Sequence, residues 1–280
     1  RNGHIWSNKM KIIDKKGGFI GAGNLASSLI SGMISAGFKP ENIMASSPGK
    51  SHLDSLSDNF GVKTSNNNEL IFKESEILIF AVKPNILKTV LEEYKNISSE
   101  GMLLISVAAG FKILDIETIL SSEQRIIRAM PNTPASIGSG VTAISLNKNA
   151  TGDDLQNAED LFSCVGEVVH IQERAMDLYT ALIGSGPAYV FYLIESLLDS
   201  SSEIEMDEES KKNMIASMIA GSAKLALMSE NSPQRLRENV TSPGGVTQRA
   251  IEEFEKNGMK KTIIEAVKAA ANKSKELGDN

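Results

Sequence analysis

Short runs of apolar residues alternate with amphipathic segments through the first part of the chain. One apolar run leads into a glycine-rich turn at residues 18–23, and residues 24–37 follow with apolar side chains at helical spacing. A helical pattern also covers residues 51–60. Further apolar runs occupy residues 42–45, 77–82, 102–107, 126–129 and 140–144. Such runs are typical of strands buried on both faces of a parallel sheet, so the alternation predicts a doubly wound α/β sheet.

The pattern changes after about residue 172. Long helical patterns follow with no strand between them, at residues 174–198, 208–229, 238–256 and 260–277. A chain of 280 residues is longer than one core usually holds. We therefore expect a sheet domain over residues 17–172 and an all-helical domain over residues 173–280. Residues 1–16 are polar and basic, lack the apolar stretch of a secretory signal, and are expected to be an extension outside the fold.

Composition narrows the class of protein. The chain is 41% apolar and 23% charged, with a formal net charge of −6, so it lacks the basic footprint of a nucleic-acid or membrane-surface binder. No apolar run reaches the roughly 18 residues that a membrane helix needs, so we expect no membrane span. Cys164 stands alone and the histidines are scattered, so no metal site is expected. These features favour a cytoplasmic protein.

The glycine turn carries the first chemical signal. Residues 21–26 read Gly-Ala-Gly-Asn-Leu-Ala, which fits the pattern G-x-G-x-x-A of dinucleotide-binding folds. Gly21 permits the tight turn, Gly23 lets backbone approach a pyrophosphate, and Ala26 lets the helix pack closely on the strand. The start of the helix offers free N–H groups to the phosphates. The turn predicts a dinucleotide site of the Rossmann type.

The end of the second strand indicates which dinucleotide is preferred. An NAD enzyme often has a carboxylate there for the ribose 2′-hydroxyl, whereas this chain has Ser46, Ser47 and, after the turn, Lys50. Two hydroxyls and a lysine suit a 2′-phosphate. The residues favour NADP(H), with NAD(H) possible.

Seven motifs in register point to one family. They read Gly-Phe-Ile-Gly-Ala-Gly-Asn-Leu-Ala at 18–26, Met-Ala-Ser-Ser-Pro at 44–48, Ala-Val-Lys-Pro at 81–84, Ser-Val-Ala-Ala-Gly at 106–110, Met-Pro-Asn-Thr-Pro at 130–134, Gly-Ser-Gly-Pro-Ala-Tyr at 184–189 and Ser-Pro-Gly-Gly-Val-Thr at 242–247. In this order and spacing the chain resembles the pyrroline-5-carboxylate reductases, which reduce a cyclic imine to proline. The resemblance runs from about residue 17 to the end.

The resemblance implies a Rossmann domain, a helical domain that interlocks with a second subunit in a homodimer, and in some members a ring of dimers. It also implies a set of cofactor-binding residues. These are Ile20, Gly21, Ala22, Gly23, Asn24 and Leu25 for the pyrophosphate, Ser47 and Asn68 near the adenine ribose beside Ser46, with Asn239 of the helical domain as a further candidate, Ala81, Val82, Lys83, Pro84, Val107, Ala108 and Ala109 for the nicotinamide half, and Glu173 for another cofactor contact.

The substrate side of the resemblance rests on two groups of residues. Thr180 matches a residue near the ring nitrogen, where it could help supply a proton, and Glu230 matches an acid that contacts proline. The substrate carboxylate is expected to bind Ser242, Gly244, Gly245, Val246 and Thr247. In that loop, glycine N–H groups and hydroxyls precede a helix, an arrangement suited to anions.

The sequence departs from the family in two places. Ile183 stands where serine is common, and residues 200–209 lack a usual glycine and a Gly-Leu-Pro-like segment. Two alternatives stay open. A 3-hydroxyacid-type dehydrogenase shares the domain plan, but residues 187–198 contain no lysine to accept a hydroxyl proton. A non-catalytic dinucleotide-sensing dimer is the other.

Overall fold

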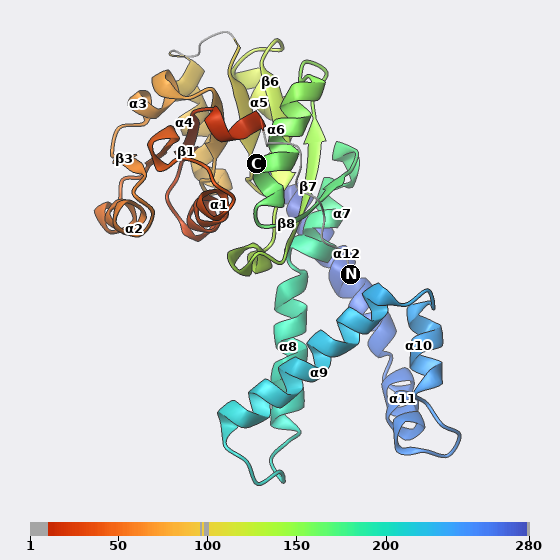
Figure 1. Ribbon diagram of the computed structural model, residues 1–280. Helices are drawn as coiled ribbons and strands as arrows, with labels where there is room; N and C mark the ends of the chain where they lie inside the picture. Colours follow the sequence, from red (N-terminus) through yellow and green to blue (C-terminus); the bar gives the residue numbers. More distant parts are fainter. Residues whose placement is uncertain (1–10, 96, 98–100, 279–280) are drawn as a thin grey trace. The chain divides into compact units, whose positions relative to one another are not determined.

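The structure is a computed structural model that describes residues 11–95, 97 and 101–278 (Figure 1). The described chain forms two compact units. One comprises the residues up to Gly184 together with those from Ala270 onward, and the other is Ser185–Ala269. Residues 173–184 and the end of the chain therefore belong to the sheet unit by their contacts, although the sequence placed them in the helical domain.

The first unit is built on one sheet with the strand order β3-β2-β1-β4-β5-β6-β7-β8. All neighbouring strands are parallel except β6 and β7. The order from β3 to β6 is that of a Rossmann fold. The strands are β1 (Gly17–Ile20), β2 (Ile43–Ser46), β3 (Lys63–Ser65), β4 (Ile77–Phe80), β5 (Leu103–Ser106), β6 (Arg125–Met130), β7 (Gly140–Leu146) and β8 (Gly166–His170).

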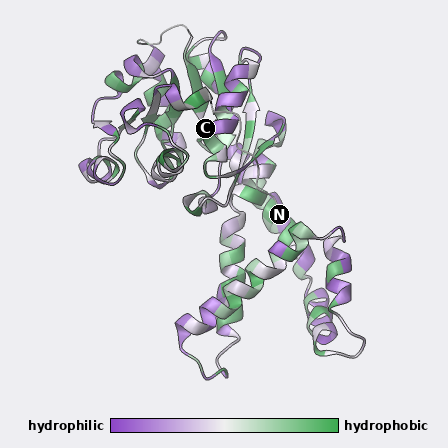
Figure 2. Cartoon of the chain, viewed as in Figure 1, coloured by the Kyte–Doolittle hydropathy of each residue, from purple (hydrophilic) through white to green (hydrophobic). Residues whose placement is uncertain are grey.

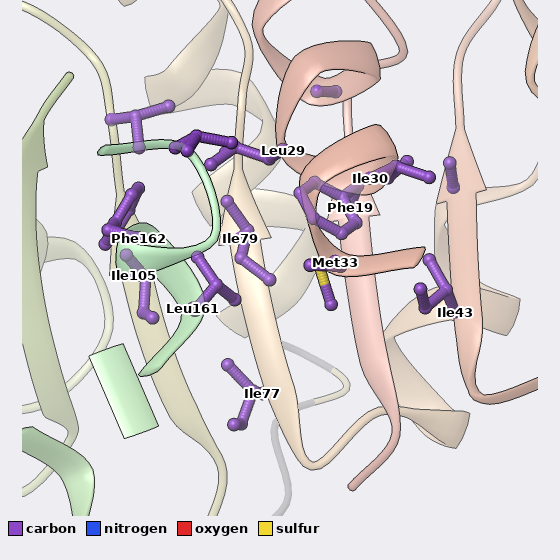
Figure 3. Packing of buried hydrophobic residues seen from close by; sticks show 14 of the residues in the cluster. Phe19, Leu29, Ile30, Met33, Ile43, Ile77, Ile79, Ile105, Leu161 and Phe162 are labelled. Carbon is purple, nitrogen blue, oxygen red and sulfur yellow. The ribbon is translucent and has the colours of Figure 1, made fainter. Parts of the chain in front are cut away.

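Alternate residues of each central strand face opposite sides of the sheet, because side chains on a strand alternate. Phe19, Ile79 and Ile105 lie in one buried cluster, where Leu29 and Phe162 pack from helices (Figure 3). Their strand neighbours, including Leu78, Phe80 and Leu104, lie in a second cluster on the other face. Both faces are therefore covered, as the apolar runs predict.

Helices cover the sheet and form the whole of the second unit. Those between the strands are α1 (Asn24–Ser35), α2 (Lys50–Phe60), α3 (Asn68–Glu74), α4 (Pro84–Lys95), α5 (Ile113–Ile119) and α6 (Gly152–Ser163), with α7 (Met176–Tyr179) after β8. Those that follow are α8 (Gly186–Asp199), α9 (Glu208–Met228), α10 (Pro233–Asn239), α11 (Val246–Lys256) and α12 (Met259–Gly278). The end of α12, from Ala270, belongs to the first unit.

Three expectations about the elements need correction. Residues 11–16 do not lie outside the fold, since Lys11–Asp14 forms a 3-10 helix whose Ile12 is buried in the core; residues 1–10 lie outside the described part. The short strands β3 and β8 escaped prediction because they are only partly buried and carry no long apolar run. The pattern at 238–256 is two helices, α10 and α11, separated by the proline-glycine turn.

The expected long helix at 174–198 is interrupted. A 3-10 turn, the short helix α7 and a π-helix over Thr180–Gly184 precede α8. The stretch Glu173–Asp199 is nonetheless long and apolar enough to cross a membrane by length and composition, against our expectation, and 6% of its most apolar window is buried. Figure 2 shows apolar residues along α8. A fully buried helix of a soluble core would pass the same test, but α8 contains no buried residue.

Candidate active site

The glycine turn lies at the carboxyl end of β1, between the ends of β2 and β4. Gly21 donates its N–H to Ser46 O at 2.9 Å, and Ala81 donates to Ile20 O at 2.8 Å. Gly21 has a φ of +106°, and a Cβ there would lie 2.4 Å from Ala81 O. Only glycine fits here, where the chain after β1 passes close to the chain after β4. The turn is therefore fixed by backbone contacts on both sides.

Gly23 has the opposite environment. It is the N-cap of α1 in extended conformation, and a Cβ built on it would meet no atom within 4 Å. No side chain caps the helix, so the first N–H groups of α1 have no side-chain acceptor. Ala26, one turn on, is fully buried. The open space and the uncapped helix start fit a pyrophosphate at Ile20, Ala22, Asn24 and Leu25, as the sequence predicts.

The end of β2 corrects one prediction. Ser46 is fully buried, and its hydroxyl donates to Asn68 Oδ1 at 2.7 Å, so its side chain cannot reach a cofactor and instead orients Asn68. Ser47 is half-buried, and its hydroxyl accepts from Gly49 N at 3.3 Å at the uncapped start of α2, next to Lys50. The hydroxyl, the lysine and the helix start together suit a 2′-phosphate.

A carboxylate that the sequence did not reveal lies beside Asn68. The Nδ2 of Asn68 donates to Glu93 Oε2 of α4 at 3.2 Å. Because Glu93 is far from β2 along the chain, the usual inspection of residues after the second strand overlooks it. Asn68 is thus held from both sides, by a serine through its oxygen and by a glutamate through its nitrogen.

The residues expected at the nicotinamide follow β4 and β5. Ala81, Val82 and Pro84 are half-buried and Lys83 is exposed, with Pro84 opening α4. Val107 and Ala108 are buried. Ala109 packs on a small cluster formed by Met130, Ala143 and Met176. This cluster connects the loop after β5 to α7, which directly precedes Thr180.

Thr180 begins the π-helix that follows α7. Such bulges occur frequently at functional sites. Its Oγ1 donates to Met176 O at 2.8 Å, and because a carbonyl only accepts, the hydroxyl proton points to the backbone. The lone pairs of Oγ1 are then available to accept a hydrogen bond. In this arrangement Thr180 suits the N–H of a protonated imine as an acceptor, and its catalytic role stays a prediction.

The departure at Ile183 involves the backbone of the same π-helix. Asn132, in the motif after β6, donates from Nδ2 to Ile183 O at 3.3 Å, and its Oδ1 accepts a hydrogen bond from Val141 N at 2.9 Å. The carbonyl of residue 183 is therefore held by a side chain that the chain retains. The contact uses the main chain of residue 183 and does not involve its side chain.

Glu173 is bound by the protein itself. Its Oε1 accepts from Ile113 N, at the start of α5, at 2.6 Å, and lies 3.3 Å from Nη1 of the buried Arg128. About a third of the side chain is exposed. Its expected contact with the cofactor stays a prediction beside this structural role.

The loop expected to hold the substrate carboxylate lies in the second unit. Gly245 is the N-cap of α11, and no side chain caps that helix. Ser242, Val246 and Thr247 are exposed. Gly244 donates its N–H to Oε1 of Gln248 at 2.6 Å, so a side chain that the sequence did not single out occupies part of the anion site.

The remaining candidates of the second unit are also exposed. Glu230 lies between α9 and α10, and Asn239 ends α10. The other cofactor candidates and Thr180 belong to the first unit, and the carboxylate loop, Glu230 and Asn239 belong to the second. Within the described residues, no group of histidine, cysteine, aspartate and glutamate side chains could hold a metal ion.

The strand order and the glycine turn define a dinucleotide-binding protein of the Rossmann type. Comparison with known families agrees: residues 16–110 match a family model described as NADP oxidoreductase, coenzyme F420-dependent, and residues 173–277 match one for pyrroline-5-carboxylate reductase dimerisation.

Whole-chain relatives name the family. The chain is 41% identical to the pyrroline-5-carboxylate reductase of Methanosarcina acetivorans over 95% of this chain and 98% of that protein, and 37% identical to that of Arabidopsis thaliana over 95% and 96%. The crystal structure of Plasmodium falciparum pyrroline carboxylate reductase with NADP bound is similar with a TM-score of 0.87 at 36% identity, covering 95% of this chain and 98% of that one. The chain belongs to the pyrroline-5-carboxylate reductase family.

Proposed function

We propose that this protein reduces the C=N bond of 1-pyrroline-5-carboxylate to give L-proline, with hydride from NADPH and, less favourably, from NADH. The observation that carries the proposal is the glycine turn of a chain that belongs to this family, with open space at Gly23 in front of an uncapped helix. The Plasmodium relative binds NADP, and the hydroxyl of Ser47, Lys50 and the start of α2 suit the additional phosphate here.

The reaction needs few protein groups. When bound, the dinucleotide supplies a hydride from its nicotinamide ring. The protonated imine carbon is already electrophilic, so the protein acts mainly by holding two reactants in line. Thr180 accepts a hydrogen bond from the iminium N–H because its own proton is committed to Met176 O. This contact favours the protonated, reactive form of the substrate.

The carboxylate of the substrate binds at the start of α11. The N–H groups of Val246 and Thr247, with the hydroxyls of Ser242 and Thr247, present donors to an anion at a helix N-terminus. Glu230 adds a negative charge for the ring nitrogen. Gln248 leaves Gly244 N when the carboxylate arrives, because an ionised acceptor makes the stronger hydrogen bond.

The assembly is part of the same proposal. The family model over residues 173–277 describes a dimerisation domain, and α8 has no buried residue in the single chain. We propose an interlocked homodimer in the cytoplasm, in which the partner covers α8, and a ring of dimers as the larger form. The apolar side chains of α8, in the second half of the stretch Glu173–Asp199, then lie at a subunit interface and do not enter a membrane.

The test is oxidation of NADPH, followed by its absorbance, with pyrroline-5-carboxylate as the acceptor and NADH as the parallel arm. Turnover that yields proline supports the proposal, and the two rates rank the cofactors. A folded dimer that binds NADPH but produces no proline would instead be the dinucleotide-sensing dimer.

A further inference from the structure

A buried ion cluster lies next to the helical turn that carries Thr180. Arg128 of β6 is 1% exposed, with Nη1 3.3 Å from Glu173 Oε1 and Nη2 3.8 Å from Asp177 Oδ1. The same oxygen of Asp177 accepts from Ser274 Oγ of α12 at 2.8 Å. All four residues belong to the first unit. An arginine is rarely buried this deeply without charged partners.

The guanidinium of Arg128 is only partly hydrogen-bonded. Among the described residues, neither Nε nor Nη2 has a hydrogen-bond partner. The separation of 3.8 Å between Nη2 and Asp177 is an ion pair but exceeds hydrogen-bond distance. Arg128 therefore holds Asp177 by charge, while Ser274 supplies the directional contact. Buried donors without partners are uncommon and call for an explanation.

The cluster is connected to Thr180 by a single turn of chain. Asp177 follows Met176, whose carbonyl receives the proton of Thr180 Oγ1. Met176 is fully buried and packs with Met130 of β6 and with Ala109 of the expected nicotinamide loop. A shift of α7 would therefore move the acceptor carbonyl and rotate the hydroxyl away from the substrate.

We propose that Arg128 and Asp177 are positioning residues for Thr180. They touch neither substrate nor cofactor; their charge pair fixes α7 on β6 and so directs the lone pairs of Thr180 at the iminium N–H. Through the hydrogen bond of Ser274 to Asp177, the end of α12 also helps to hold α7. This inference rests on the proposed reductase function and adds to it the residues that set the geometry of one catalytic contact.

The variant that tests it is Asp177→Asn, which removes the charge but keeps the shape and an oxygen for Ser274. We expect kcat to fall by roughly 10- to 100-fold, since small misplacements at a reacting centre cost this much. The dissociation constant of NADPH, measured without substrate, should not change. A loss of NADPH affinity with kcat intact would overturn the proposal.

A double-mutant cycle separates positioning from general stability. If Asp177 acts through Thr180, the substitution Asp177→Asn should change kcat by less than about twofold in a Thr180→Val background. Multiplicative effects in the double variant would overturn the proposal. If Asp177→Asn does not fold, Ser274→Ala enters the same cycle, because it removes one hydrogen bond and leaves both charges.

Asp154→Asn is the matched control. Asp154 is also buried and pairs with Arg125 at the start of β6, with Nη1 2.7 Å from Oδ1. This variant should lose stability and retain the kcat of the wild type. A fall in kcat equal to that of Asp177→Asn would show that any broken ion pair on β6 has this effect. Failure of the wild type to turn over would contradict the proposed function itself, a separate outcome.

Discussion

Gly21 and Gly23 stand two residues apart and serve different physical purposes. Gly21 has a positive φ and no room for a side chain next to Ala81. Gly23 has ordinary backbone angles and open space where a Cβ would be. The first glycine therefore serves the fold and the second serves a ligand. Substitutions should separate the two roles.

Gly23→Val is expected to fold normally and to lose cofactor. The added side chain occupies the space in front of α1, so the dissociation constant of NADPH should rise by about a hundredfold or more, a loss of about 3 kcal/mol. Gly21→Ala should instead lower the free energy of unfolding by roughly 1–3 kcal/mol, because it strains a left-handed residue against a carbonyl. NADPH titration and urea unfolding measure both. Unchanged NADPH affinity in Gly23→Val would refute the pyrophosphate site.

Cys164 should be chemically inert in the folded protein. Burial, with a smaller contribution from the charge of Asp160, raises the pKa of its thiol to about 12. A raised pKa depletes the thiolate, so at mildly alkaline pH the native thiol should react with a disulfide reagent about a thousandfold more slowly than the unfolded chain. The comparison of native and urea-unfolded protein checks this. Equal rates would mean that the thiol is accessible and ionised.

The sequence predicts residues whose role lies in the backbone more reliably than those whose role depends on direction. The roles of Gly21 and Ala26 follow from spacing alone. Ser46 and Ser47 are adjacent and chemically identical, and only the strand pleat decides that one points to Asn68 and the other outward. The direction of the Thr180 proton depends on a carbonyl four residues earlier, which no motif reveals.

Among the elements, the apolar runs predicted the buried central strands, but they gave no sign of features that depend on contacts between distant segments. Residues 174–198 keep a helical pattern, yet the chain forms a π-helix at Thr180–Gly184, where Asn132 takes up the carbonyl of Ile183. The π-helix thus coincides with a tertiary contact that the periodicity of the segment does not encode. Close approaches between distant elements are equally invisible in the sequence.

The turn after β5 makes one such approach to the end of α12. Gly110 has a φ of +76°, and a Cβ there would lie 3.0 Å from Ser274 O and from Leu277 Cβ. Gly110→Ala should lower the free energy of unfolding by about 2–4 kcal/mol through backbone strain and overpacking. Gly138→Ala is the control, since Gly138 has a similar φ of +69° but open space, and it should show the strain alone. Urea unfolding that ranks the two variants equally would contradict this contact.

Two substitutions at the start of α11 test the substrate site, because they should affect KM for the substrate differently. Thr247→Ala removes a donor, so KM for pyrroline-5-carboxylate should rise by about tenfold, with KM for NADPH unchanged. Gln248→Ala frees Gly244 N, and KM for pyrroline-5-carboxylate should stay the same or fall. Steady-state kinetics with each substrate varied in turn measures both. A rise in KM in Gln248→Ala would mean that Gln248 binds the substrate and does not compete with it.

At the scale of the whole molecule, the sheet unit buries its apolar side chains within one chain, whereas the helical unit leaves several of them exposed. Alternate strand residues fill two buried clusters, so the first unit has a complete core. In α8, by contrast, Val190, Phe191 and Tyr192 are exposed, and Tyr192 is 71% accessible. Apolar periodicity predicts a helix here, but a single sequence does not say whether its apolar face is covered by the same chain. The match of residues 173–277 to a dimerisation model supports a cover from a second copy of the chain.

Phe191→Glu should therefore convert the protein to monomer. Phe191 is 62% exposed in the single chain, and placing a carboxylate in an apolar interface costs several kcal/mol without a partner charge. Sedimentation velocity should show the mass of one chain for the variant and of a dimer for the wild type. Leu114→Glu, at a residue of α5 that is 66% exposed and lies outside the dimerisation region, should leave the wild-type mass unchanged. If Phe191→Glu stayed dimeric while the wild-type protein floated with lipid vesicles, the apolar face of α8 would bind a membrane, and the interlocked dimer would be wrong.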